Sequence, residues 1–201
     1  MSSSSDLTAR ARIRDAAIEL MAERGIGGAT IRDIAQAAGV SSGLVRHHFG
    51  SKEGLRAACD EYVMNVFTGI GQRFADSMMV DGVTPELLRL QRYIVQSMMD
   101  ESPAASTLFD RMMEYGEQWL AGTDLKVRDP RAVIAVIGVM KLSMYTMSDQ
   151  LSRVLGEDVR TPRGWTRVLQ ASLEIFSHPV ITPEQADRAR EALERFLSPE
   201  E

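Results

Sequence analysis

Residues 31–55 of this 201-residue chain read IRDIAQAAGVSSGLVRHHFGSKEGL, and this stretch decides the fold. Thr30 and Asp33 have the three-residue spacing of a capping box, in which each side chain bonds the other residue's backbone N–H. A helix is therefore expected over about residues 31–38. Gly39 follows it and can adopt the left-handed conformation that commonly ends a helix.

A second short helix is expected directly after this turn. Ser41 can cap a helix over about residues 42–49, and Gly50 closes it. Val45 and Phe49 lie four residues apart, so they give this helix a buried stripe. Two short helices joined by a tight turn have the dimensions of a helix-turn-helix.

The outward face of the second helix is polar and basic. Advancing about 100° per residue from the buried stripe places Gly43 and His47 directly opposite it, with Leu44, Arg46 and His48 on the flanks. The residues expected to face a partner are Ser41, Ser42, Arg46, His47 and His48. Such a face suits a DNA major groove, and Ser51 and Lys52 at the next helix start can meet backbone phosphates. Spacing alone leaves open an ordinary helical hairpin in an all-α protein.

The quoted residues, from the first short helix through GSKEGL, resemble the tetracycline-repressor (TetR) family of transcriptional regulators. The resemblance covers about residues 8–56, including the first helix and its Gly-rich loop. It implies a three-helix DNA-binding head over residues 1–56 and a larger ligand-binding and dimerisation body over residues 57–201. It also implies binding to operator DNA as a homodimer.

The resemblance places DNA contacts at the start of the second helix, along the third helix and just beyond it. Together with Ser41 from the outward face, the candidate DNA-binding residues are Thr30, Arg32, Ser41, Ser42, Gly43, Leu44, Arg46, His47, His48 and Lys52. One position departs from the family pattern, because tyrosine is usual where Arg46 stands. An arginine there can reach guanine O6 and N7 or a phosphate.

The charge of the chain is divided between these two parts. The net charge is −5, which alone argues against a nucleic-acid partner. Residues 1–56 nevertheless carry eight Arg and Lys against six Asp and Glu, whereas residues 57–201 carry 15 against 22. The head is therefore basic and the body acidic.

Composition excludes several other classes of protein. The 44% hydrophobic and 25% charged content is that of a globular chain rather than a disordered one. The longest apolar run, Ala132–Met140, is too short for a membrane span of about 20 residues. The serine-rich Met1–Asp6 stretch is expected to be a frayed tail and lacks the pattern of a signal peptide. With Cys59 as its single cysteine, the chain is expected in the cytoplasm.

Helix starts in the rest of the chain follow from proline. Six of the seven prolines come directly after Ser, Thr or Asp, and five of these, all but Pro199, open a predicted helix. Proline at the first helical position gives up an N–H that has no partner there. The predicted helices cover residues 85–100, 103–121, 130–155, 162–177 and 183–197. With a first helix ending near Arg24–Gly25 and a long fourth helix from about residue 52, the chain is expected to be all-α, with about nine helices.

The middle helices are rich in methionine, a residue that fills irregular space and adapts to varied shapes. Ten of the twelve methionines lie after residue 57. The predicted ligand pocket comprises Met98, Met112, Tyr115, Trp119, Met140, Lys141, Met144 and Tyr145. Two alternatives stay open: the methionines can be ordinary core, and Lys141 can extend to solvent instead of bonding an effector. The effector is expected to be largely apolar, neutral or cationic.

The last two predicted helices carry apolar stripes that need a partner. The candidate dimerisation residues are Trp165, Leu169, Leu173, Phe176, Leu193 and Phe196. In the family the equivalent pair packs against its two-fold mate as a four-helix bundle, which matches a palindromic operator. Burial against the chain's own body is the alternative.

Catalytic interpretations find little support, so no enzyme, metal or cofactor is expected. His47 and His48 are adjacent and diverge on a helix, so they cannot chelate one metal ion. Cys59 lies on the inward face of the fourth helix as a structural thiol. Gly25, Gly27 and Gly28 lie between two helices and fit no dinucleotide fingerprint.

The sequence thus predicts a homodimeric repressor that binds double-stranded operator DNA and is released by a small-molecule effector. By family inference, an effector among the middle helices shifts the fourth helix and separates the two recognition helices. Two alternatives are an effector-independent DNA-binding regulator and a helical small-molecule-binding protein or enzyme that does not bind DNA.

Overall fold

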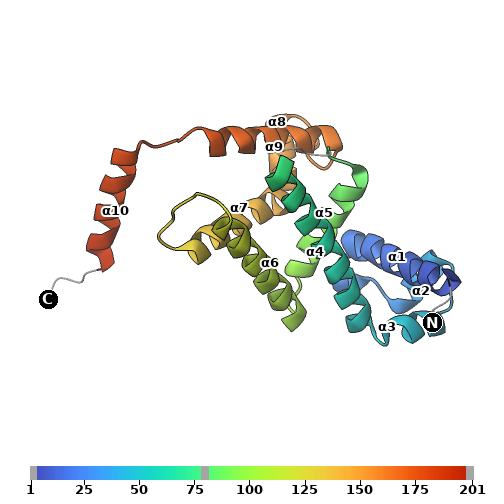
Figure 1. Ribbon diagram of the computed structural model, residues 1–201. Coiled ribbons are helices and arrows are strands. Elements are labelled where there is room, and N and C mark those ends of the chain that lie inside the picture. Colours follow the sequence, from blue (N-terminus) through green and yellow to red (C-terminus); the bar gives the residue numbers. More distant parts are fainter. Residues whose placement is uncertain (1–3, 78–81, 198–201) are drawn as a thin grey trace.

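The computed structural model describes residues 4–77 and 82–197, and within these ranges the chain is helical without strands. Its ten helices are arranged as in Figure 1. They are α1 (Ser4–Gly28), α2 (Ile31–Ala38), α3 (Ser42–Phe49), α4 (Lys52–Ser77), α5 (Pro85–Met98), α6 (Pro103–Ala121), α7 (Pro130–Thr146), α8 (Ser148–Leu155), α9 (Pro162–Ser177) and α10 (Pro183–Leu197). The all-α prediction is confirmed.

The proline-based helix starts are confirmed, and most carry the expected cap. The side chains of Thr84, Asp129 and Thr161 each accept a hydrogen bond from a backbone N–H of the first turn. α1 begins at Ser4, inside the predicted tail, and residues 1–3 lie outside the described part. Its backbone leaves the helical conformation at Gly25 (φ 75°, ψ 166°), where the first helix was expected to end.

Ten helices stand where nine were expected because the predicted 130–155 helix is broken at Met147. Its backbone (φ −104°, ψ 25°) separates α7 from α8, and the two helices are bent by 70°. The bend lets Leu151 and Leu155 of α8 pack against the buried Val159 and Trp165. Burial of this apolar surface stabilises the break.

The interior divides into three apolar clusters. The largest joins α1, α2, α3 and α4 to α5 and α6, and its fully buried members include Ile13, Met21 and Leu55. The second surrounds Trp165, whose ring stacks on Tyr145 with centroids 4.3 Å apart. The third lies between α6 and α7. Each fully buried Leu or Ile contributes roughly 1.5–3 kcal/mol to the free energy of unfolding.

The largest cluster crosses the predicted head–body boundary at residue 56. Leu55, Cys59 and Val63 of α4 are all fully buried, together with Ile13 of α1 and Tyr93 of α5. α4 therefore packs with both parts of the chain, and the division into residues 1–56 and 57–201 remains a prediction.

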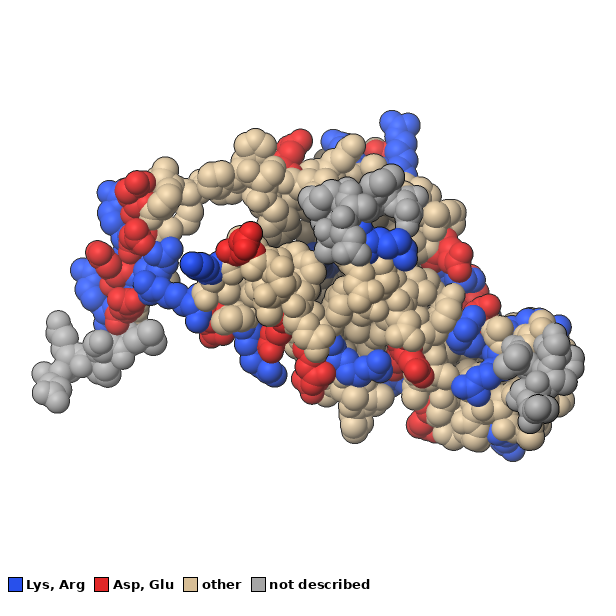
Figure 2. Space-filling view, in the orientation of Figure 1, with Lys and Arg blue, Asp and Glu red and all other residues tan. Residues whose placement is uncertain are grey.

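α10 stands apart from the other helices in Figure 1. An ion pair joins its Glu194 to Arg128 of the α6–α7 loop at 3.2 Å. Its side chains Leu193 and Phe196 are 63% and 85% exposed. Figure 2 shows acidic and basic side chains mixed along the same helix.

Within the described ranges, no single helix combines the length and apolar character that crossing a membrane requires. α7 and α8 meet that test only when taken together across their 70° bend.

We predict that Gly54→Ala destabilises the junction between α3 and α4. A Cβ atom at Gly54 would lie 2.1 Å from the carbonyl oxygen of Phe49, which is backbone and cannot rotate away. We expect a loss of about 1–3 kcal/mol in the free energy of unfolding. Urea unfolding at fixed protein concentration measures it.

Gly69→Ala is the matched control in the same helix. Its Cβ would meet the mobile end of Arg73 at an ordinary 3.5 Å, so we expect a gain of roughly 0.5–1 kcal/mol from helix propensity. Equal effects of the two substitutions would contradict the predicted clash.

Candidate nucleic-acid interface

The turn between α2 and α3 has the predicted geometry. The Asp33 N–H donates to Thr30 Oγ1 at 3.2 Å, and the Thr30 N–H donates to the Asp33 carboxylate at 3.4 Å, which completes the capping box. The hydrogen bond from the Thr30 hydroxyl is the main cause that lowers the pKa of Asp33. Gly39 is left-handed (φ 66°, ψ 39°) and ends α2. Local hydrogen bonds therefore set the angle between the two helices.

α3 buries one side and exposes the other. Val45 is fully buried, whereas Gly43, Arg46 and His47 are exposed. Ser41 is also exposed, and its Oγ caps the helix by accepting from the Leu44 N–H at 3.1 Å. Among the other predicted contacts, Ser42, Leu44 and His48 are half-buried. No acidic residue lies in α3, so its outer face suits a polyanion.

Arg46 has the free guanidinium that a base or phosphate contact requires. This guanidinium makes no hydrogen bond or ion pair to any residue of the described ranges. A planar guanidinium can bond O6 and N7 of one guanine together. Arg46 is therefore the candidate for sequence reading on this helix.

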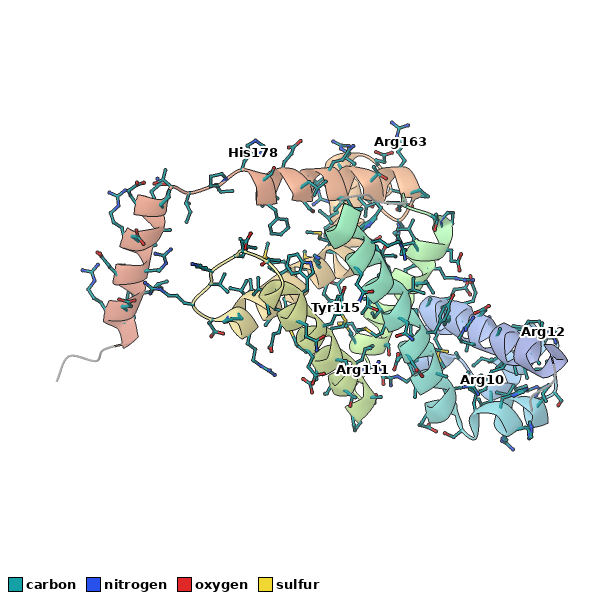
Figure 3. All side chains as sticks on the ribbon, in the orientation of Figure 1. Arg10, Arg12, Arg111, Tyr115, Arg163 and His178 are labelled. Atoms are coloured by element: carbon teal, nitrogen blue, oxygen red, sulfur yellow. The ribbon has the colours of Figure 1, made fainter. Side chains whose placement is uncertain are left out.

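Arg10 holds the end of α3 from α1, a contact that the sequence did not reveal. Its Nη1 donates to the carbonyl oxygen of His48 at 3.0 Å, and its guanidinium lies 4.7 Å from the ring centroid of Phe49. Figure 3 shows Arg10 and Arg12 at the end of the molecule that holds α1 and α3. An arginine at a helix C-terminus satisfies a free carbonyl and the helix dipole.

Lys52 and the start of α2 flank this face. Lys52 Nζ donates to the carbonyl oxygen of Gly27 at 3.1 Å, so it ties the start of α4 to the last turn of α1. Its ammonium group keeps further N–H donors for a phosphate. Thr30 and Arg32 are exposed beside it.

The predicted pocket residues are divided among the apolar clusters. Met98 and Met112 pack against the largest cluster, whereas Met144 and Tyr145 belong to the one around Trp165. The remaining four lie elsewhere: Tyr115 donates to the Thr68 carbonyl at 3.1 Å, and Trp119, Met140 and Lys141 are exposed. In the described part of the chain, these residues are thus divided between separate apolar clusters and the surface.

Lys141 has no ion-pair partner in the described part of the chain. Part of the Lys141 residue is exposed to solvent. The protein atoms around its ammonium group reduce the solvation of the charge, and this lowers its pKa below the usual value for lysine. The group favours a neighbour that accepts hydrogen bonds.

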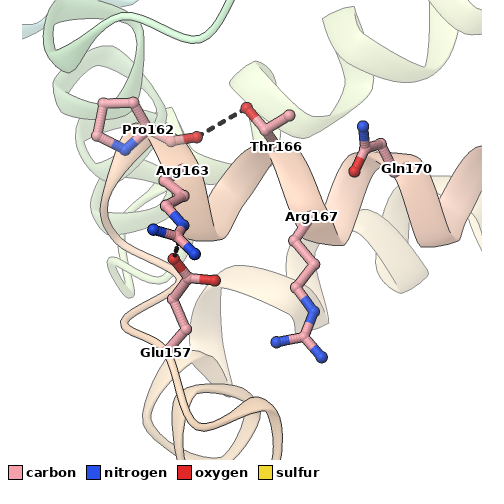
Figure 4. Close-up of a pocket in the computed structure, with 6 residues that line it drawn as sticks. All are labelled: Glu157, Pro162, Arg163, Thr166, Arg167 and Gln170. Carbon is pink, nitrogen blue, oxygen red and sulfur yellow. Dashed lines mark hydrogen bonds and ion pairs between the residues drawn. The ribbon is translucent and has the colours of Figure 1, made fainter.

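A hollow of about 580 Å³ lies along the first half of α9 and the loop after α8, lined by Glu157, Pro162, Arg163, Thr166, Arg167 and Gln170 (Figure 4). Its two arginines are paired: Arg163 with Glu157 at 2.8 Å, and Arg167 with the Leu155 carbonyl at 2.8 Å. It is open to solvent rather than enclosed, as ligand sites usually are.

The predicted dimerisation residues fall into two groups. Trp165 is 3% exposed and Leu169 is half-buried, and both pack within the chain's own second cluster. The other four, Leu173, Phe176, Leu193 and Phe196, are 56–85% exposed. The chain therefore covers the first half of the α9 stripe and leaves the rest open.

Groups of metal-binding side chains are absent from the described residues. No three His, Cys, Asp or Glu side chains there are placed to hold a metal ion. Burial raises the pKa of the Cys59 thiol far above its usual value, so it is held in the unreactive protonated form.

Comparison with known proteins identifies the family. Residues 13–59 match the model of the bacterial regulatory proteins of the tetR family. The chain is 43% identical to the HTH-type transcriptional regulatory protein RaaS of Mycobacterium tuberculosis, over 97% of this chain and 94% of that protein. The chain belongs to the tetR family. It is a DNA-binding transcriptional regulator, and its relatives are regulators rather than enzymes.

Two further matches agree with this tetR membership. The HTH-type transcriptional repressor KstR2 of Rhodococcus jostii is 52% identical over 23% of this chain and 22% of that protein. A TetR-family regulator from Rhodococcus sp. shares the fold, with a TM-score of 0.56, 18% identity and coverage of 70% of this chain and 87% of that one. The sequence match to KstR2 is short, and the structural match shows the fold alone.

We predict that Arg46→Ala weakens binding to the preferred operator by about 1–3 kcal/mol and relaxes the preference at one base pair per half-site. The reason is loss of a guanidinium that no other residue supplies on α3. Selection from a random duplex pool, followed by sequencing, measures the preference at each position.

Lys52→Ala provides the contrast, because a phosphate contact carries no sequence information. We expect this substitution to weaken binding to all duplexes by the same factor, and to lower the slope of log K against log salt concentration by about 1. If Arg46→Ala left the base preferences intact, Arg46 would be reduced to a phosphate contact.

Proposed function

We propose that this tetR-family protein is a homodimeric repressor whose two α3 helices bind successive major grooves of a palindromic operator. A small, largely apolar effector releases it. The observation that carries the proposal is the acid-free outer face of α3, with the unpaired Arg46 held at the surface by local caps and by Arg10. The protein acts in the cytoplasm, where its DNA lies.

Support for the dimer comes from apolar surface that the chain leaves uncovered. Leu173 and Phe176 near the end of α9, and Leu193 and Phe196 on α10, are all more than half exposed. Exposed apolar side chains in such number mark a protein interface. A two-fold interface uses the same surface on both chains and places two α3 helices symmetrically, as a palindrome requires.

Support for an effector comes from the composition of α5, α6 and α7. Methionine and aromatic side chains recur there, and Trp119 and Met140 are 39% and 42% exposed. Flexible thioethers suit an apolar ligand of irregular shape. Lys141 follows Met140 on α7 and has a lowered pKa, and we propose that it bonds a polar end of the ligand.

A second candidate is a regulator that binds DNA without an effector. The division of the predicted pocket residues among separate clusters favours it. The two candidates differ in one observable, which is whether any compound releases the bound DNA.

We predict salt-sensitive binding of the purified protein to duplex DNA from the region upstream of its own gene, measured by fluorescence anisotropy. Absence of such binding would remove the repressor assignment.

A thermal-shift screen of neutral aromatics, hydrophobic cations and acyl carboxylates then seeks the effector, since a ligand at 100-fold excess over Kd adds about 2.7 kcal/mol of stability. Stabilising compounds that leave DNA bound would favour the effector-free candidate.

We also predict that Leu173→Glu combined with Phe196→Glu converts a dimer to monomers at micromolar concentration in sedimentation experiments. Charges buried in an apolar interface carry a large desolvation cost. The control is Arg163→Glu, at a 90% exposed side chain away from this surface, which should stay dimeric. A dimer unchanged by the double substitution would place the interface elsewhere.

A further inference from the structure

Arg56 is an almost fully buried arginine one turn beyond the start of α4. It is 5% exposed, and its guanidinium is enclosed by the end of α5 and the joint before α6. Nη2 donates to the Ser97 carbonyl at 2.7 Å, and Nη1 donates to the Asp100 carboxylate at 2.6 Å and to Ser102 Oγ at 2.5 Å. Arginine is rarely buried without such partners. One side chain therefore joins α4 to three residues of the α5–α6 region.

A carboxylate on the same helix completes the network. Asp60, one turn after Arg56, is 6% exposed and lies 3.7 Å from the Arg56 Nε. It accepts hydrogen bonds from the hydroxyls of Tyr93 at 2.7 Å and Ser97 at 2.8 Å, both on α5 and both fully buried. α4 and α5 are thus joined by polar bonds at two successive turns.

Ser102 gives up its ordinary role to enter this network. It occupies the N-cap position of α6, yet its side chain makes no cap hydrogen bond, unlike the caps of α5, α7 and α9. The hydroxyl instead accepts a hydrogen bond from Arg56. The hydrogen bond between the Ser102 side chain and the Asp100 carboxylate is the main cause that lowers the pKa of Asp100. A residue that departs from a local rule commonly serves a functional constraint.

Directional bonds do here what apolar packing cannot. The contact of α4 with α1 and α5 through Leu55, Cys59 and Val63 is apolar, and apolar attraction has no preferred direction. A guanidinium fork fixes both distance and angle to its acceptors. Since α3 ends at Phe49 and α4 begins at Lys52, the angle of α4 also sets the direction of the recognition helix.

We propose that Arg56 is the positioning residue that sets the angle of the DNA-binding helices against the body, and hence the operator half-site spacing that the dimer accepts. The inference rests on the proposed function.

The test compares wild type with Arg56→Lys, which keeps the charge and loses the fork, and with the milder Ser102→Ala. An operator is selected from random DNA, and its half-sites are then moved apart or together by one and two base pairs. We expect each variant to reduce the ratio of Kd between altered and favoured spacings, by roughly 2- to 30-fold for Arg56→Lys. Arg89→Met is the matched control, because Arg89 joins α5 to Glu19 of α1 through one bond of 3.0 Å.

Equal loss of affinity at every spacing, or an equal effect of Arg89→Met, would overturn the assignment of Arg56.

A second measurement needs no DNA. Spin labels on Gln36→Cys in α2 and Glu114→Cys in α6, both exposed sites, report the distance between the two helices, and the buried Cys59 is left unlabelled. Labelled chains are diluted with unlabelled ones. Arg56→Lys should broaden the distance distribution, and an unchanged width would refute the inference. Wild type that binds no duplex would refute the proposed function instead.

Discussion

The burial of the first turns of α4 between α1 and α5 is the constraint on which the rest of the structure depends. Leu55, Cys59 and Val63 are completely enclosed there. By chain connection the start of α4 belongs to the DNA-binding helices, and by packing it belongs to the body. A change in how α5 and α6 lie therefore cannot leave the recognition helix where it was, provided that the polar bonds of Arg56 hold.

The head could be predicted closely from the sequence because its signals are local. The capping box of Thr30 and Asp33, the left-handed Gly39 and the cap at Ser41 each act within a few residues, and all are found as expected. The same holds for helix starts at proline. Arg10 and Arg56 could not be found this way, since their partners lie 38 and more than 40 residues away. In the sequence both look like ordinary surface charges.

The body is harder to predict because periodicity gives the apolar side of a helix and not what covers it. The stripe on α9 is real, but its first half turns toward Tyr145 and Val159 of the same chain. The pocket residues depend on how α5, α6 and α7 cross, which is set by the fit of side chains at each contact. The break at Met147 has the same origin, because it is stabilised by the packing of α8 against Val159 and Trp165, which helix periodicity does not reveal.

The position of α10, apart from the other helices, affects how fast a newly synthesised chain is degraded. A single copy carries Val180, Phe196 and much of α9 as exposed apolar surface, which is what chaperones and proteases of the cell recognise. Pairing hides that surface only when copies are numerous enough to meet. We therefore expect unpaired chains to be degraded quickly. When the rate of synthesis is lowered, a larger share of the chains stays unpaired, so the cellular concentration of the protein falls by a larger factor than the rate of synthesis.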